Sequence, residues 1–319
     1  MEKALVVGAT GGTGAAITEE LVRRGIRTVA FGRSIQKLEQ LRASLGNPEN
    51  LALAAGDAFR PSDIVKAAEG VDVLFHCANV PYHEMVNKLV PLGESVMEAA
   101  DQLGLKVVVI DGIYPYGRSK MDRVTEEHPK QPHTKKGKIR HAYENMLFDE
   151  RWIHAKVMIV RLPDYYGPTA NEASYLGSTL EAIAAGKMAL FIGNMRVPRE
   201  FVFLPDAAFM IVQLAARDEG WGENWNIPGA GLISGREIVR IAQQASGSTK
   251  PVIPLGKCGL SLLGLGVPVM KEIVEMLYLT EEPLVLSGGK YERRVGPIRA
   301  TSFEQGITDT IRTLQKNKL

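Results

Sequence analysis

Seven residues near the start of the chain have the composition of a phosphate-binding turn. Glycines recur at every third position, as Gly8, Gly11 and Gly14, after the apolar run KALVV and before a helical pattern. Glycine allows a tight turn after a strand and lets the backbone approach a pyrophosphate closely. The free N–H groups at the start of a helix then face the anion. The segment therefore predicts a dinucleotide-binding loop whose contacts come from Gly8, Thr10, Gly11, Gly12, Thr13 and Gly14.

Basic residues after the second apolar run indicate which dinucleotide is bound. A carboxylate at this position would hold the ribose 2′-hydroxyl of NAD(H). The run RTVAF is followed instead by Arg33 and Ser34, with Lys37 one turn later. A guanidinium matches a 2′-phosphate in charge and geometry, so these residues favour NADP(H) over NAD(H). After the third run, Asp57 and Ala58 are expected to meet the adenine, and an aspartate that only closes a turn is the alternative.

These loops need a parallel sheet to position them. Five short apolar runs alternate with helical patterns before residue 112, and a sixth covers residues 155–162. Continuous apolar runs are typical of strands buried on both faces, and a helix between each pair implies right-handed crossovers. Ser34 is a candidate N-cap, and Gly25 and Gly46 are expected to follow the ends of the first two helices. The pattern predicts an α/β fold with a Rossmann-like, doubly wound parallel sheet.

The regular alternation weakens after about residue 168. The rest of the chain mixes helical stretches with Pro- and Gly-rich joints, which predicts a smaller, helix-rich C-terminal portion. We expect a dinucleotide-binding domain over residues 1–168, with a contribution from residues 201–228, and a mainly substrate-binding portion over residues 169–319. The length of 319 residues accommodates this division.

Composition argues against several other classes of protein. The formal net charge is +2, which gives no reason to expect binding to nucleic acid or to an anionic membrane surface. Two cysteines cannot form a disulfide framework, and the six histidines lack metal-binding spacing, so no metal site is expected. No apolar stretch is long enough to span a bilayer, and the first residues do not resemble a leader peptide. We therefore expect a cytoplasmic protein.

Several segments together resemble the extended and atypical short-chain dehydrogenase/reductase superfamily, close to its NAD-dependent epimerases and dehydratases. These segments span most of the chain and read GATGGTG, VVVIDGIYPYG, MIVRLPDYYGP, FVFLPDAA and WNIPGAGLISGREI. The resemblance implies that Ala78 and Asn79 flank the cofactor and that Pro163 lies near the nicotinamide. It also implies that Tyr165 and Tyr166 line the substrate crevice, and that the chain forms a homodimer.

The catalytic residues of that superfamily are replaced at the expected positions. Its members use a Ser after the fifth strand and a Tyr-x-x-x-Lys on the following helix, and the phenol transfers a proton while the nicotinamide transfers hydride. When the motif is aligned on Tyr116 and Gly117, the serine falls on Gly112, beside Asp111. When it is aligned on Glu144, the tyrosine and lysine fall on Lys136 and Arg140. Arg140 would keep a cationic contact to the ribose but cannot exchange a proton. Asp111 is expected beside the cofactor.

Tyr114, Lys136 and Arg140 are the candidate catalytic residues. Tyr114 lies two residues past the missing serine, where it could reach the nicotinamide and the substrate. Lys136 could act as a general acid if burial destabilises its charge, or as an anion clamp for an acidic substrate. The alternative is that Lys136 and Arg140 are surface residues of a decayed site. The basic segment 125–140 is expected to be a solvated loop that enters a helix.

Three functions are compatible with these residues. The favoured one is an NADP(H)-dependent oxidoreductase that acts on a small carbonyl or hydroxyl substrate with a non-standard proton donor. An epimerase or dehydratase acting on a sugar-like substrate is the second, and the missing tyrosine counts against it. A non-enzymatic NADP(H)-binding sensor is the third. The C-terminal portion that resembles the enzymes' substrate-binding part favours an enzyme.

Overall fold

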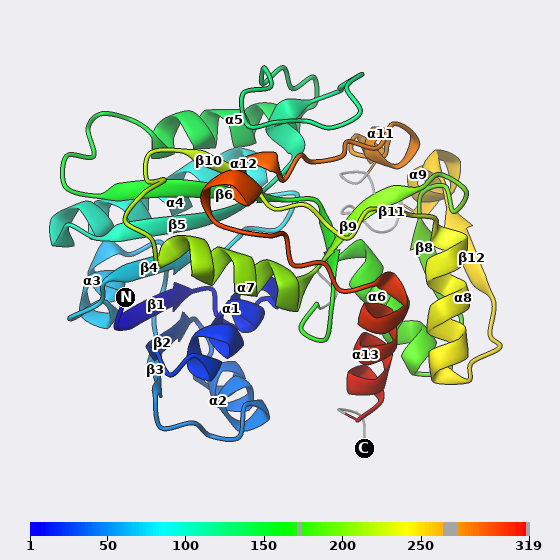
Figure 1. Ribbon diagram of the computed structural model, residues 1–319, viewed down its shortest axis with the longest axis horizontal. Coiled ribbons are helices and arrows are strands. Elements are labelled where there is room, and N and C mark those ends of the chain that lie inside the picture. The colour runs from blue at the N-terminus through cyan, green and yellow to red at the C-terminus, as the bar shows by residue number, and fades with distance from the viewer. Residues whose placement is uncertain (171–173, 264–273, 317–319) are drawn as a thin grey trace.

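The computed structural model describes residues 1–170, 174–263 and 274–316 (Figure 1). A seven-stranded parallel sheet lies at its centre, in the order β10-β6-β5-β4-β1-β2-β3. Its strands are β1 (Lys3–Val7), β2 (Arg27–Gly32), β3 (Leu51–Ala55), β4 (Val73–His76), β5 (Lys106–Gly112), β6 (Lys156–Leu162) and β10 (Asn224–Asn226). This arrangement confirms the predicted α/β fold and the six expected strands. The strand order reverses between β1 and β4, which is where such sheets bind ligands.

Helices cover both faces of the sheet (Figure 1). One face packs against α1 (Gly12–Arg23), α2 (Ile35–Ser44) and α7 (Leu204–Ala215), and the other against α3 (Pro61–Ala67), α4 (Met85–Leu103) and α5 (Lys135–Leu147). Along β1, Ala4 and Val6 belong to the first core, while Leu5 and Val7 belong to the second. This alternation within a continuous apolar run is what a strand buried on both faces requires.

The predicted helix boundaries are confirmed for the first two helices. The Ser34 side chain accepts a hydrogen bond from the Lys37 backbone N–H at 3.3 Å and so caps α2. Gly25 and Gly46 follow the ends of α1 and α2 with φ angles of 75° and 80°. Because L side chains avoid these angles, glycine suits the position at which each helix ends.

A second group of elements packs at the carboxyl end of the main sheet. A three-stranded sheet contains β7 (Asp164–Tyr166), β9 (Arg199–Phe203) and β11 (Leu232–Ile233), and a parallel pair contains β8 (Ala189–Ile192) and β12 (Val252–Leu255). Their helices are α6 (Tyr175–Ala184), α8 (Gly235–Ser246) and α13 (Phe303–Lys316), which share a third core. The short elements are η1 (Tyr114–Tyr116), α9 (Lys257–Leu263), α11 (Tyr278–Glu281) and α12 (Gly289–Arg294).

Some elements that come late in the chain pack with the main sheet rather than with the second group. Helix α7 packs against α1, and β10 pairs with β6, so these later segments lie with the main sheet. The division into two domains stays a prediction. Among the described residues, no helix is both long enough and apolar enough to cross a membrane.

Candidate active site

The glycine loop connects β1 to α1 and lies directly against the end of β4. Gly8 has a φ of 84°, and a Cβ on it would lie 2.5 Å from the backbone nitrogen of Ala78. A Cβ on Gly14 would lie 2.2 Å from the Gly8 carbonyl oxygen. Gly11 precedes α1 and supplies no side-chain cap to the helix. The close backbone approach and the uncapped N-terminus fit the pyrophosphate of a dinucleotide.

The residues expected around the rest of the dinucleotide lie at neighbouring strand ends. Arg33 is exposed where β2 ends, and Pro163 is buried where β6 passes into β7. Asp57 follows β3, and its Oδ1 accepts a hydrogen bond from the Phe59 backbone N–H at 3.1 Å. That hydrogen bond closes a turn, which is the alternative role that the sequence suggested for Asp57. The cofactor contacts of all three residues stay predictions.

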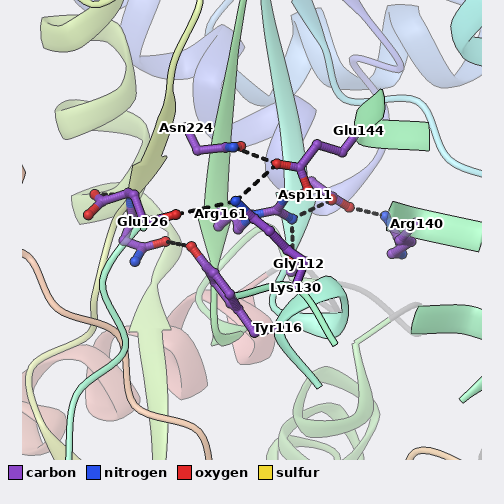
Figure 2. A network of polar contacts seen from close by, with 10 residues as sticks. Asp111, Gly112, Tyr116, Glu126, Lys130, Arg140, Glu144, Arg161 and Asn224 are labelled. Atoms are coloured by element: carbon purple, nitrogen blue, oxygen red, sulfur yellow. Dashed lines mark hydrogen bonds and ion pairs between the residues drawn. The ribbon is translucent and has the colours of Figure 1, made fainter. Parts of the chain in front are cut away.

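Asp111, at the carboxyl end of β5, is held between two arginines (Figure 2). Arg140 of α5 donates from Nη1 to Oδ1. Arg161 of β6 donates from Nη1 to Oδ2 at 2.7 Å and to the Gly112 carbonyl oxygen at 2.9 Å. Both carboxylate oxygens of Asp111 are therefore engaged by protein cations. The geometry makes Asp111 a partner of Arg140, while its predicted contact with the cofactor is untested.

The network continues from Arg161 to Glu144 (Figure 2). Arg161, whose side chain is fully buried, donates from Nη2 to Glu144 Oε2 at 2.6 Å. Glu144 Oε1 accepts from the Asn224 amide at 2.5 Å and lies 3.3 Å from the Lys130 ammonium nitrogen. Buried charges are costly unless each finds a partner of opposite sign. Two carboxylates and three cations from different parts of the chain meet this requirement together.

The segment before α5 is more buried than expected. Glu126 has 6% of its surface exposed and accepts a hydrogen bond from the Asn226 backbone N–H at 2.9 Å. The Asn226 side chain in turn accepts from the Tyr116 hydroxyl at 2.9 Å. The prediction of a solvated loop over residues 125–140 is therefore wrong for its inward-facing side chains. A basic composition does not reveal that Lys130 and Glu126 find buried partners.

Lys136 and Arg140 both lie inside the protein, so the surface-residue alternative is wrong. Their residues are 2% and 7% exposed. Burial opposes the charge of Arg140, but the neighbouring Asp111 outweighs it and raises the pKa of the guanidinium. Arg140 is therefore a fixed cation that cannot exchange protons. The Lys136 ammonium lies 3.3 Å from a carboxylate oxygen of Glu275 and 5.5 Å from the ring centroid of Tyr82.

Tyr114 lies above Arg140 and forms a pair with a second tyrosine. The Arg140 guanidinium carbon is 5.4 Å from the centroid of the Tyr114 ring. The Tyr114 hydroxyl is hydrogen-bonded to the hydroxyl of Tyr82, which lies between β4 and α4, and the Tyr82 ring stacks on Tyr175 at 6.2 Å. Burial raises the pKa of Tyr114 well above its ordinary value, Tyr82 and Asp164 add to the rise, and Arg140 opposes it.

Tyr165 and Tyr166 lie in different surroundings, although they are neighbours in β7. Burial raises the pKa of Tyr165 to about 12, and the nearby Thr13 of the glycine loop opposes this shift, while the ring packs against the first core. Tyr166 is 1% exposed and packs against Phe203 and Phe303 in the third core. Its burial does not match the expected position on the crevice wall. Adjacent residues of a strand point to opposite faces, which explains the difference.

Two further residues at the end of β4 lie beneath this site. His76 is 1% exposed, and burial lowers its pKa to about 4, while the nearby Asp111 opposes the shift. Burial raises the pKa of the Cys77 thiol well above its ordinary value, which matches a packing role rather than a nucleophile. Among residues 1–170, 174–263 and 274–316, no three His, Cys, Asp or Glu side chains gather as metal ligands would.

Sequence reasoning missed Tyr82, Tyr175 and Glu275. Tyr82 follows β4 in the same loop as the expected cofactor residues, so its position at the carboxyl edge is a usable signal. No local pattern marks the other two, because Tyr175 begins a helix and Glu275 meets Lys136 across 139 positions of sequence. The tertiary fold alone brings these residues to the site.

The sheet order and the glycine loop define a Rossmann-type dinucleotide-binding protein. The chain belongs to the NAD dependent epimerase/dehydratase family, whose model matches residues 4–228. This match confirms the resemblance drawn from the sequence motifs. It also places the chain among enzymes and identifies its cofactor class as a nicotinamide dinucleotide.

Individual relatives span a range of substrates. The chain is 27% identical to the sterol demethylase protein B of Methylococcus capsulatus, covering 98% of this chain and 88% of the relative. It is 22% identical to an uncharacterized UDP-glucose epimerase of Bacillus subtilis, covering 77% and 82%. These two names do not point to one substrate for this chain.

Solved structures share the fold along nearly the whole chain. A dTDP-glucose 4,6-dehydratase double mutant from Streptomyces venezuelae, with NAD bound, superposes with a TM-score of 0.80 at 19% identity, covering 99% of this chain and 97% of that one. A UDP-glucuronic acid 4-epimerase from Bacillus cereus, with NAD and UDP-glucuronic acid, superposes with a TM-score of 0.79 at 19% identity, covering 99% of both.

Proposed function

We propose that this enzyme is an NADP(H)-preferring oxidoreductase that interconverts a carbonyl and a hydroxyl group on a small molecule, with Tyr114 as the proton donor. The observation that carries the proposal is the hydroxyl pair of Tyr82 and Tyr114 beside Arg140, at the carboxyl edge of the sheet near the glycine loop. The nicotinamide supplies or accepts the hydride when it is bound.

The side chains around Tyr114 have separate roles in the proposed proton transfer. Tyr114 donates its phenolic proton to the substrate oxygen during reduction and recovers it during oxidation. The phenolate that forms is stabilised by the fixed charge of Arg140, which opposes the rise in the pKa of Tyr114 that burial and Tyr82 cause. Asp111 and Arg161 hold Arg140 in position, since Arg161 anchors Asp111 and Asp111 accepts from Arg140. In this arrangement Arg140 provides the cation that a lysine provides elsewhere in the superfamily.

Two observations support the preference for NADP(H). Arg33 is exposed at the end of β2, where a 2′-phosphate would be recognised, and Lys37 is exposed on the first turn of α2. No carboxylate follows β2 at the position that would hold a ribose 2′-hydroxyl. The cytoplasmic location and the homodimer expected from the sequence stay predictions.

The proton donor is tested by comparing Tyr114→Phe with Tyr143→Phe. Tyr143 is also a buried tyrosine, and it packs on α4 against Gly93. NADPH oxidation is followed with a panel of aldehydes and ketones. Tyr114→Phe should lower the rate by about 10²–10⁴-fold, which is the usual contribution of a positioned acid, and Tyr143→Phe should stay near the parent rate. Equal rates in the two variants would show that Tyr114 is not the donor.

A second candidate is an epimerase or dehydratase acting on a sugar nucleotide. The family match and the solved structures of that chemistry favour it. Because the hydride returns to the substrate, no net nucleotide change occurs, and the test is product analysis with UDP-glucose or dTDP-glucose. Membership in a family of enzymes counts against the non-catalytic sensor.

A further inference from the structure

A carboxylate from a distant part of the chain occupies the start of α5. Glu275, before α11, accepts a hydrogen bond from the Lys136 backbone N–H at 3.0 Å through Oε1. The same oxygen lies 3.3 Å from the Lys136 ammonium nitrogen. The Lys136 side chain is only 2% exposed, whereas that of Glu275 is 28% exposed. The buried member of this pair is therefore fixed on a helix, and its partner reaches the solvent.

Three positive features meet at this oxygen. The Thr134 hydroxyl caps α5 by accepting from the Gly137 N–H at 3.0 Å, which leaves the Lys136 N–H directed at Glu275. The ammonium group and the positive end of the 13-residue helix α5 add to this N–H. Together they form a site for a carboxylate, and the protein's own glutamate shows how such a group binds there.

The site opens into a cavity and borders the proposed proton donor. Glu275 lines a cavity of about 450 Å³, and the other charged residues of its lining are Arg118, Lys135, Lys257 and the acidic Glu281. On its other side, the Lys136 ammonium lies 5.5 Å from the ring of Tyr82, whose hydroxyl is bonded to Tyr114. A carboxylate held at Lys136 would therefore be close to a carbonyl or hydroxyl group at the tyrosine pair.

We propose that the substrate carries a carboxylate, which replaces Glu275 at Lys136 when it binds. This inference rests on the proposed oxidoreductase function. A buried ammonium group is stabilised by an anion beside it, so exchanging the Glu275 carboxylate for a substrate carboxylate preserves this pairing. Glu275 is the group that moves because it is partly exposed, and Lys136 stays fixed within α5.

Calorimetric binding to the NADPH-loaded enzyme tests this exchange. The probes are lactate, 3-hydroxybutyrate and 4-hydroxybutyrate, with butan-2-ol as the uncharged match. NADPH prevents oxidation of these alcohols, so binding is measured without turnover. At least one acid should bind about tenfold or more tightly than butan-2-ol, as expected for a charge-assisted contact. Glu275→Gln should tighten that acid by about tenfold because it removes the internal competitor, and Lys136→Met should abolish the preference.

The controls separate this inference from the proposed function. Glu282→Gln alters an exposed ion pair with Arg118 and should leave the affinity for the acids unchanged. NADPH affinity and the Tyr114→Phe rate are measured first. If NADPH does not bind, or if Tyr114→Phe keeps the parent rate, the proposed function itself has failed. If NADPH binds and Tyr114 is needed, the inference alone fails when no acid binds better than butan-2-ol, or when Glu275→Gln does not tighten binding. The Glu275→Gln result decides the matter if Lys136→Met does not fold.

Discussion

Replacing Arg161 with methionine should destabilise the folded protein far more than replacing an exposed arginine. Arg161 is fully buried and makes three hydrogen bonds, to Asp111 at 2.7 Å, to the Gly112 carbonyl at 2.9 Å and to Glu144 at 2.6 Å. Methionine replaces the side chain as far as the Nε position with an apolar chain and removes the charged end. Removing one member of a buried ion pair costs about 3–5 kcal/mol, because the remaining charge loses its partner.

The structure places the expected loss near the lower end of that range. After the substitution, Asp111 keeps its bond to Arg140, and Glu144 keeps Asn224 and Lys130. Each carboxylate therefore retains a cation, and neither is left isolated. We expect a decrease of about 3 kcal/mol in the free energy of unfolding, measured by urea titration with circular dichroism.

Arg151→Met is the matched control for this prediction. Arg151 pairs with Glu94 at 2.8 Å, a distance close to those of Arg161, but the two side chains are 47% and 43% exposed. Exposed pairs contribute about 0–1 kcal/mol, because water and salt screen them. The reasoning would be refuted if Arg161→Met cost no more than Arg151→Met. That result would mean that the buried network does not hold β5, β6 and α5 together.

Two further predictions concern the cofactor and the dependence on pH. Arg33→Ala should weaken NADPH binding by about tenfold to a hundredfold and leave NADH binding unchanged in a fluorescence titration. The control is Arg42→Ala, which alters another exposed arginine. Equal losses of affinity for both nucleotides would contradict the contact between Arg33 and the 2′-phosphate. Burial holds the pKa of His76 at about 4, below the 6.5 of the unfolded chain. Stability should therefore be lost as pH falls from about 6.5 towards 4, by roughly 1.4 kcal/mol per pH unit, and urea titrations of His76→Phe should lack this slope. The same slope in both proteins would assign the acid sensitivity to other groups.

The central sheet and the glycine loop were predictable because their signals are local. A strand buried on both faces reads as a continuous apolar run, and Ser34 and Gly46 mark the two ends of one helix within a few positions. Gly8 and Gly14 are needed because backbone atoms approach where a side chain would stand. Such requirements act on each position separately and therefore leave a pattern in the residue types.

The burial of the charged residues was not predictable in the same way. Lys136 and Arg140 read equally well as surface residues, because a helix with lysine and arginine is usually exposed. Arg140 is buried because Asp111 of β5 meets it, and Lys136 because Glu275 comes from 139 positions away. A favourable site for a buried charge depends on partners from other elements, and these partners have no fixed spacing in sequence.

The amino-acid sequence by itself determined the α/β architecture and the position of the dinucleotide loop, and it predicts that the Ser and Tyr-x-x-x-Lys residues are replaced. The tertiary structure decided which side chains surround the proposed reaction centre, namely the Tyr82 and Tyr114 pair, the Arg140 cation and the pair of Lys136 and Glu275. Secondary structure follows from apolar periodicity and backbone freedom within short windows. Side-chain chemistry at a site depends on burial and on charges from distant segments, which only the folded chain brings together.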